Sequence, residues 1–134
     1  MTIQPYLFFD GRCEEAIEFY RSTLGAKVEM LMRFKESPEP TQMPPGSEEK
    51  VMHASLQIGD TTIMASDGLC GGRENFQGFA LSVTVPTAEE AERVFATLGK
   101  DGEVRMPLAK TFYSPSFGMV ADKFGVTWMV IVPM

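Results

Sequence analysis

The sequence EEAIEFYRSTLGAKVEM at residues 14–30 is matched by EEAERVFATLGKDGEVRM at residues 89–106. Both segments begin with Glu-Glu-Ala, continue to Leu-Gly and end in an alternating run that closes on methionine. Apolar residues at helical spacing precede each Leu-Gly, so each segment predicts a helix that stops at glycine and is followed by a strand. Two copies of one motif in a fixed order indicate an internal duplication.

The flanks of the two segments extend the match. Ile58-Gly59 corresponds to Phe124-Gly125, Thr61 to Thr127 and Ile63 to Met129. We expect a helix at residues 13–24 and a second helix after Thr87, which forms a capping box with Glu90. The predicted strands are residues 3–9, 27–34, 51–58 and 61–66 in the first copy, and residues 79–85, 103–108, 117–121 and 126–132 in the second copy.

This order predicts an α+β fold with two βαβββ modules in tandem. We expect one domain, residues 1–134, made of module one (1–68), a glycine-rich linker (69–76) and module two (77–134). The second module is shorter because it lacks the acidic, proline-rich loop at residues 35–49. That loop is the one hint of a regulatory or interaction module.

Composition excludes several classes of protein. The net charge is −6 and no Lys/Arg cluster occurs, so we expect no nucleic-acid partner. No apolar run approaches the ~20 residues of a membrane span, and no basic leader begins the chain, so we expect no membrane partner and a cytoplasmic location. Cys13 and Cys70 are then expected to be unpaired thiols. The ten methionines are either core filler or the lining of a pliable apolar pocket.

Motifs for nucleotide cofactors are missing from the sequence. No Gly-x-Gly-x-x-Gly follows a predicted strand, and residues 68–72 lack the Lys-Ser/Thr of a phosphate-binding loop. The glycine-rich turn of a methyl-donor site in a parallel sheet is missing too. We therefore expect no cofactor.

Several short motifs resemble one known family. They are Pro5-Tyr6-Leu7-Phe8-Phe9, the helix around residues 14–20, Met52-His53-Ala54, Gly59-Asp60, Met64-Ala65-Ser66-Asp67, and Asp122-Lys123-Phe124-Gly125 followed by Trp128. Together they resemble the PhnB-like branch of the vicinal oxygen chelate superfamily, which includes glyoxalase I, bleomycin-resistance proteins and extradiol dioxygenases. Members of this branch are often labelled demethylubiquinone methyltransferase-like.

The resemblance implies a cupped mixed sheet, the glyoxalase/bleomycin resistance fold, that encloses a pocket. It also implies a homodimer. In metal-using members four inward positions supply the ligands, and by motif register these fall on Pro5, Met64, Gly78 and Met129. None of these residues offers an imidazole or a carboxylate. A register slip of one position at Pro5 or Gly78 would bring in Gln4, Tyr6, Gln77 or Phe79, which hardly improve the donor set. Independently, the chain has a single His, whereas catalytic zinc and iron sites draw on two or three His or on His with carboxylates. We therefore expect no metal.

Four residues are candidates for ligand binding. His53 is mid-strand, where it either faces solvent or binds a ligand as a hydrogen-bond partner or general base. Asp67 either forms a turn or joins the site. Tyr113 lies between two strands and is either a hydrogen-bond partner of the ligand or a surface-loop aromatic. Trp128 is either a core residue or a stacking platform. Arg33 and Lys110 are positioned to attract an anion but are more typical of solvated faces.

Two functions follow. The first is a metal-free small-molecule-binding protein with an apolar, Met- and aromatic-lined cup, for which bleomycin-resistance proteins are the precedent in the family. The alternative is an enzyme, a lyase, isomerase or transferase, that uses His53 with Asp67 or Tyr113 for acid–base chemistry. The sequence does not identify the ligand.

Overall fold

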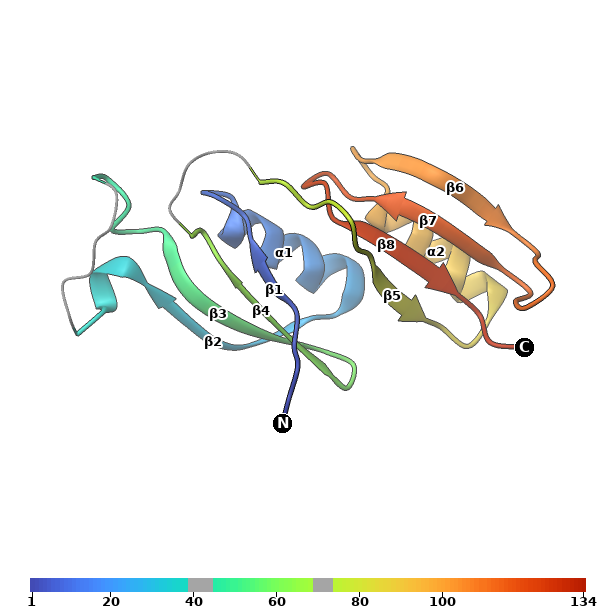
Figure 1. Cartoon of the computed structure of the whole chain (residues 1–134), viewed down its shortest axis with the longest axis horizontal. Coiled ribbons are helices and arrows are strands. Elements are labelled where there is room, and N and C mark those ends of the chain that lie inside the picture. Colours follow the sequence, from blue (N-terminus) through green and yellow to red (C-terminus); the bar gives the residue numbers. More distant parts are fainter. Residues whose placement is uncertain (39–44, 69–73) are drawn as a thin grey trace. The chain divides into compact units, whose positions relative to one another are not determined.

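The computed structural model describes residues 1–38, 45–68 and 74–134 and divides into two compact units, Met1–Glu74 and Asn75–Met134. Each unit contains one helix and one four-stranded sheet (Figure 1). The expected linker at residues 69–76 spans the boundary between the units, and its residues 69–73 lie outside the described residues, as do residues 39–44 of the expected long loop.

The first unit has the sheet order β1-β4-β3-β2. Strand β1 runs parallel to β4, and the other pairs are antiparallel, so the sheet is mixed. Its elements are β1 (Tyr6–Phe8), α1 (Cys13–Leu24), β2 (Lys27–Arg33), the 3-10 turn η1 (Phe34–Glu36), β3 (Val51–Ile58) and β4 (Thr61–Ser66).

The second unit repeats this topology as β5-β8-β7-β6, with β5 parallel to β8. Its elements are β5 (Leu81–Thr84), α2 (Ala88–Leu98), β6 (Glu103–Ala109), β7 (Phe117–Ala121) and β8 (Thr127–Ile131). The predicted α+β fold of two βαβββ modules is therefore confirmed. The strands form two four-stranded sheets, one in each unit.

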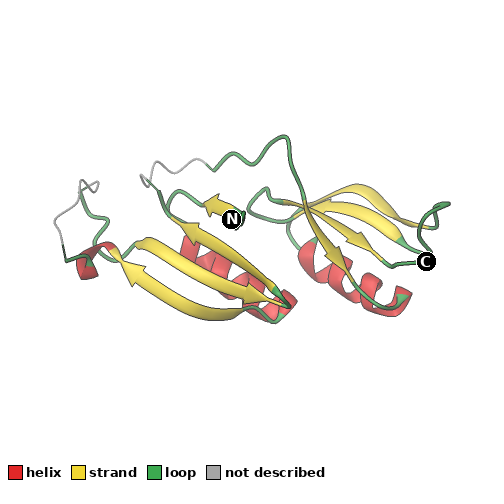
Figure 2. Ribbon diagram, turned by 60° about the horizontal axis from the view of Figure 1, so that its bottom comes forward, coloured by secondary structure: helices red, strands yellow, loops and turns green. Residues whose placement is uncertain are grey.

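One helix covers one face of each sheet (Figure 2). In the first unit, Leu7, Leu56 and Ile63 are buried from the sheet side, at 2%, 1% and 6% exposure, and Ala16 and Ile17 from the helix side. Burial of each large aliphatic side chain contributes roughly 1.5–3 kcal/mol. Successive side chains in a strand point to opposite faces of the sheet. The residues between these buried ones therefore lie on the sheet face opposite the helix.

Strand β2 is more irregular than its alternating sequence indicates. Its register with β3 shifts between Val28 and Met30 and again between Met32 and Arg33. A bulge of this kind places two residues opposite one and turns the following side chains to the other face. Leu31, which breaks the sequence alternation, pairs with the buried Ala54 and so faces the helix.

The match of Ile63 with Met129 is wrong by one residue. Ile63 and Trp128 both face the helix of their unit, at 6% and 2% exposure, whereas Met129 is cross-strand partner to Met119 on the other face. The reason is turn length: two residues join β3 to β4, but Asp122–Val126 joins β7 to β8. An alignment of Gly59 with Gly125 is therefore off by one residue in the strands that follow. An error of one residue exchanges the two faces of a strand, because side chains alternate with a period of two.

The two helices begin differently. The Thr87 hydroxyl accepts a hydrogen bond from the Glu90 N–H at 3.1 Å, as the capping box predicts, but the Glu90 carboxylate pairs with Arg93. Helix α1 has no side-chain cap from Arg12. The carboxylate of Asp67, at the end of β4, serves its first turn instead. Within the described part of the chain, no helix has the length and apolarity needed to cross a membrane.

Candidate functional site

The sheet face opposite α1 in the first unit gathers aromatic rings, thioethers and one imidazole. Cross-strand pairs place side chains on a common face, and Tyr6 pairs with Met64, Met64 with Ser55 and Ser55 with Met30. His53 pairs with Met32 on the same face. We call this surface the outer face of the first unit and define it by Tyr6, Phe8, Met30, Met32, His53, Ser55 and Met64.

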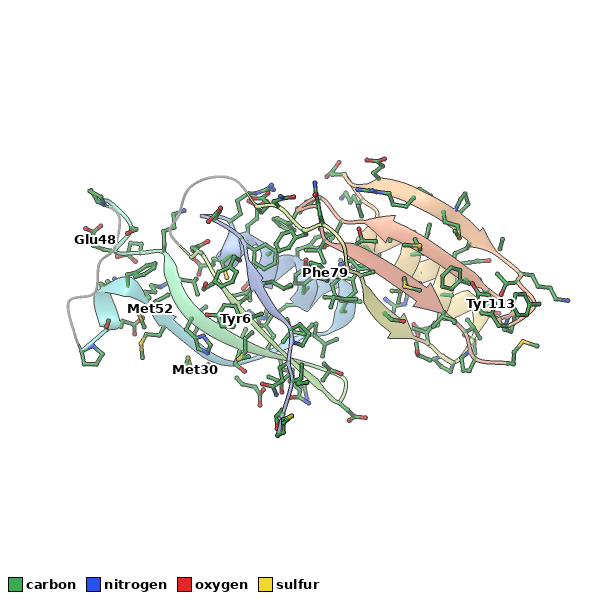
Figure 3. The ribbon with its side chains drawn as sticks, in the orientation of Figure 1. Tyr6, Met30, Glu48, Met52, Phe79 and Tyr113 are labelled. Atoms are coloured by element: carbon green, nitrogen blue, oxygen red, sulfur yellow. The ribbon has the colours of Figure 1, made fainter. Side chains whose placement is uncertain are left out.

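The outer face is partly accessible. Phe8 is 54% exposed and Met30 is 42% exposed, while Tyr6, His53 and Met64 are half-buried. Tyr6 and Met30 come from the two opposite edge strands, β1 and β2 (Figure 3). Exposed apolar side chains that lie around a few polar atoms are typical of a ligand-binding surface.

Tyr6 and His53 form the polar centre of this face. The Tyr6 hydroxyl is hydrogen-bonded to His53 Nδ1 at 2.9 Å, across 47 positions of sequence. Their ring centroids lie 5.5 Å apart at an interplanar angle of 38°, and the Tyr6 ring lies 4.9 Å from that of Phe8. The Tyr6 ring is therefore in contact with both of the other rings.

Tyr6 was not predicted from the sequence as a partner of His53. The alternation in β1, with buried Leu7 between Tyr6 and Phe8, contains the signal. Only the parallel pairing of β1 with β4 shows that Tyr6 and His53 share a face, because that pairing joins residues far apart in sequence.

The second unit has the same row of positions with different chemistry. Met106 pairs with Met119, Met119 with Met129 and Met129 with Ser82, in parallel with the row from Met30 to Tyr6. Ser82 thus stands in the place of Tyr6. Two residues before Met119, Phe117 stands in the place of His53. Of the two sheets, the first one alone carries the Tyr–His pair.

The ligand positions expected from metal-using relatives shift in the structure. Met64 lies opposite Tyr6 rather than Pro5, and Met129 lies opposite Ser82, whereas Gly78 precedes the start of β5. Within residues 1–38, 45–68 and 74–134, no three His, Cys, Asp or Glu side chains group closely enough to hold a metal ion. A phenol, a thioether and one imidazole do not match the donor set of a catalytic zinc or iron site.

Asp67 is buried, at 1% exposure, and its carboxylate is occupied by the backbone. Oδ1 accepts hydrogen bonds from the N–H groups of Gly11 at 2.7 Å and Cys13 at 2.8 Å, and Oδ2 accepts one from Val51 at 2.8 Å. A negative charge at the start of α1 is also favoured by the helix dipole. This geometry gives Asp67 a structural role, because its hydrogen bonds connect the end of β4 to the starts of α1 and β3.

Trp128 lies in the core of the second unit. It is 2% exposed, and its Nε1 donates a hydrogen bond to Asp122 Oδ2 at 2.9 Å. Its cross-strand neighbours are Leu81 and the fully buried Val120. This placement matches the core alternative for Trp128 rather than a stacking platform.

Tyr113 lies in the connection between β6 and β7 and is 43% exposed (Figure 3). Its ring contacts Phe112 edge-on at 5.0 Å and Phe117 at 5.6 Å. Tyr113 and Trp128 belong to the second unit, and His53 and Asp67 to the first. The hydrogen bond found for His53 in the described chain is the one to Tyr6.

The two candidate cations differ in their surroundings. Arg33 donates to both oxygens of Glu14, at 3.0 and 2.6 Å, and to the Glu49 carbonyl, so its charge is already paired. This pairing lowers the pKa of Glu14, chiefly through the Arg33 hydrogen bond. Lys110 is exposed beside β6.

Known proteins match this chain over nearly its whole length. A family model described as 3-demethylubiquinone-9 3-methyltransferase matches residues 1–131. Protein YjdN of Escherichia coli (strain K12) is 36% identical over 140 residues, which cover 98% of this chain and 95% of that protein.

Several solved structures are also similar to this chain. Protein PA1353 from Pseudomonas aeruginosa is similar with a TM-score of 0.87 and 42% identity, covering 99% of this chain and 98% of its own. A putative 3-demethylubiquinone-9 3-methyltransferase, PhnB protein, from Bacillus cereus has a TM-score of 0.82 and 30% identity, covering 98% and 99%. A glyoxylase/bleomycin resistance protein/dioxygenase domain from Frankia has a TM-score of 0.67 at 13% identity, covering 98% and 94%, which shows a shared fold.

Proposed function

This chain belongs to the family described as 3-demethylubiquinone-9 3-methyltransferase, PhnB-like proteins with the glyoxalase/bleomycin resistance fold, and we propose that it binds a small organic molecule on the outer face of the first unit. The observation that carries the proposal is the hydrogen-bonded Tyr6–His53 pair on a face where the apolar side chains of Phe8 and Met30 are exposed. Methyl transfer is not part of this proposal, because the sequence lacks the glycine-rich turn of a methyl-donor site.

The comparison of the two units supports this location. The duplicated sheet keeps methionines at Met64 and Met129, but the first unit alone combines them with a tyrosine and a histidine. The methionines supply adaptable apolar contacts, and the Tyr6–His53 pair supplies the polar atoms that orient a ligand. We propose binding without a metal, because the donor set of this face does not suit one.

Of the other candidate residues, Asp67 has a positioning role in this proposal. Asp67 holds Val51, two residues before His53 in β3, and so helps to fix the position of His53 in its strand. Tyr113 and Trp128 lie in the second unit, where Trp128 is part of the core.

Methionine-methyl NMR tests the proposal. With ¹³C-methyl methionine in the protein, a fragment library of uncharged aromatic molecules is expected to shift the signals of Met30, Met32 and Met64. The signals of Met119 and Met129, in the corresponding row of the second unit, serve as the internal control. Shifts confined to the second unit, or no binders at all, would contradict the proposal.

The second candidate function is an enzyme that uses His53 as a general acid or base. The hydrogen bond to Tyr6 favours it, since such a bond orients an imidazole for proton transfer. If turnover of a bound molecule is found, His53→Gln is expected to abolish it while leaving the melting temperature unchanged. Full activity in His53→Gln would remove this mechanism.

We also propose a homodimer. Strands β2 and β6 are edge strands of their sheets, and each exposes a valine, Val28 at 38% and Val104 at 52%. Edges with exposed apolar side chains favour pairing with another chain. Sedimentation velocity is expected to show a dimer at micromolar concentration, and a monomer there would contradict this assembly.

A further inference from the structure

We infer that the ligand presents a hydrogen-bond acceptor oxygen, carried on a flat aromatic ring, to Nε2 of His53. The inference rests on the proposed function and deepens it by giving the chemical class of the ligand. It starts from one contact, the 2.9 Å hydrogen bond between the Tyr6 hydroxyl and His53 Nδ1.

The direction of this hydrogen bond follows from the chemistry of the two groups. A neutral imidazole has one N–H donor and one acceptor nitrogen, and a phenol hydroxyl is both a donor and an acceptor. The imidazole nitrogen is a strong acceptor, whereas the phenol oxygen is a weak one because its lone pairs are delocalised into the ring. The Tyr6 hydroxyl therefore donates to Nδ1, and the proton of the neutral ring is on Nε2.

Nε2 remains a hydrogen-bond donor when the imidazole ring is protonated. In the imidazolium both nitrogens carry a proton, and the Tyr6 oxygen then accepts from Nδ1. In either charge state Nε2–H is a donor. No partner for Nε2 is found within the described residues, so this donor is available to a ligand. A ligand that meets it has to offer a carbonyl, ether, phenolate or carboxylate oxygen.

The surroundings of His53 define the rest of the ligand. The Tyr6 ring lies 4.9 Å from that of Phe8 and 5.5 Å from that of His53, and Phe8 is 54% exposed. Rings at these separations favour stacked or tilted contact with a further ring. Thioethers of the neighbouring methionines, Met32 opposite His53 and Met64 opposite Tyr6, make favourable contacts with ring edges. A flat ring with an acceptor oxygen therefore fits this surface.

Nitrogen NMR tests the first step directly. The chain contains one histidine, so ¹⁵N-histidine labelling of the untagged protein gives the signals of a single imidazole. At a pH where the ring is neutral, we expect a pyridine-type signal for Nδ1 and a pyrrole-type signal for Nε2. The opposite assignment, with the proton on Nδ1, would overturn the inference.

Three naphthalenes of similar shape test the ligand class. The ketone 2-acetylnaphthalene offers an acceptor, 2-isopropylnaphthalene offers neither donor nor acceptor, and 1-(2-naphthyl)ethylamine offers a charged donor. Binding is read from the His53 ¹⁵N signals and the methyl signals of Met32 and Met64. We expect the ketone to bind roughly three- to tenfold more tightly than the hydrocarbon, and the amine to bind more weakly than the ketone.

The outcomes separate this inference from the proposed function. Equal affinities for the three probes at the outer face would overturn the acceptor requirement and leave the proposed function standing. If no probe perturbs His53, Met32 or Met64, the inferred ligand class is overturned, whereas the proposed function is overturned only if the fragment library also gives no binder at this face. In His53→Phe, which copies the residue at Phe117 of the second unit, the preference for the ketone is expected to disappear while the hydrocarbon still binds.

Discussion

The carboxylate of Asp67 accepts a hydrogen bond from the backbone N–H of Val51 at 2.8 Å, two residues before His53 in β3. Its other oxygen accepts from Gly11 and Cys13 at the start of α1. One buried side chain thus joins three segments that are distant in sequence. The position of His53 therefore depends on a residue that has no direct contact with it among the contacts found.

Asp67→Asn is expected to lower the free energy of unfolding by roughly 2–3 kcal/mol. The amide keeps one acceptor oxygen, but its NH₂ group then faces a backbone N–H, so a buried donor loses its partner. Urea denaturation measures the change. Asp60→Asn, at the exposed turn between β3 and β4, is the matched control and is expected to change stability by less than about 0.5 kcal/mol. Equal effects of the two substitutions would contradict the structural role of Asp67.

The thiol of Cys13 makes stability depend on pH above the neutral range. Burial raises the pKa of this thiol, and the negative charges of Asp67 and Glu14 raise it further. The folded chain therefore keeps the proton, and the unfolded chain releases it near the ordinary value of 9.0. This contribution to stability is complete below that pH and is lost as the pH rises above it, by up to ~1.4 kcal/mol per pH unit.

Urea denaturation between about pH 7.5 and 10.5 tests this dependence, with Cys13→Ala as the comparison. The variant is expected to be less stable at neutral pH, because Cys13 is fully buried, but to lose less stability as the pH rises. Cys70, which lies outside the described residues, is present in both proteins and so cancels in the comparison. Parallel curves for the two proteins would show that Cys13 has no such role.

Trp128→Phe separates a core role from a ligand-binding role. Removal of the indole N–H takes away the buried hydrogen bond to Asp122, so we expect a loss of roughly 1–3 kcal/mol in unfolding free energy. Ligand affinity at the first unit is expected to stay within twofold of the wild-type value. Intact stability with lost binding would instead identify Trp128 as a stacking platform.

Sequence alone predicted both helices and the strands of this fold to within a few residues, because helical periodicity, strand alternation and turn glycines are local signals. Helix α1 and strands β3, β4 and β7 have the expected bounds. The faces of β2 and β8 were harder to predict. A bulge at β2 and a longer turn before β8 shift the side chains by one position, and neither feature is visible in an apolar pattern.

The site was predicted in part. His53 was found as the single histidine in a strand, and its half-buried place on the outer face is consistent with that choice. Tyr6, its hydrogen-bond partner 47 positions away, was missed because the parallel pairing of β1 with β4 joins residues that are far apart in the sequence. The structural use of Asp67 was equally hidden, since its three partners are backbone N–H groups that carry no sequence signal.

Native mass spectrometry tests the absence of a catalytic metal. After exposure to Zn²⁺, Mn²⁺, Fe²⁺, Co²⁺ and Ni²⁺ and buffer exchange, we expect no ion retained in a fixed ratio to the chain. The physical reason is the donor set of the outer face, a phenol, thioethers and one imidazole. One tightly held ion per chain would contradict the metal-free account.

The affinity of the strongest-binding aromatic fragment for three proteins tests the central claim most directly. These are the wild type, His53→Phe in the first unit and Phe117→Leu at the corresponding position of the second unit. With melting temperatures showing that all three are folded, we predict that His53→Phe raises the dissociation constant about tenfold, and that Phe117→Leu changes it by less than about twofold. An unchanged constant in His53→Phe, or a larger effect of Phe117→Leu, would contradict a ligand site centred on Tyr6 and His53.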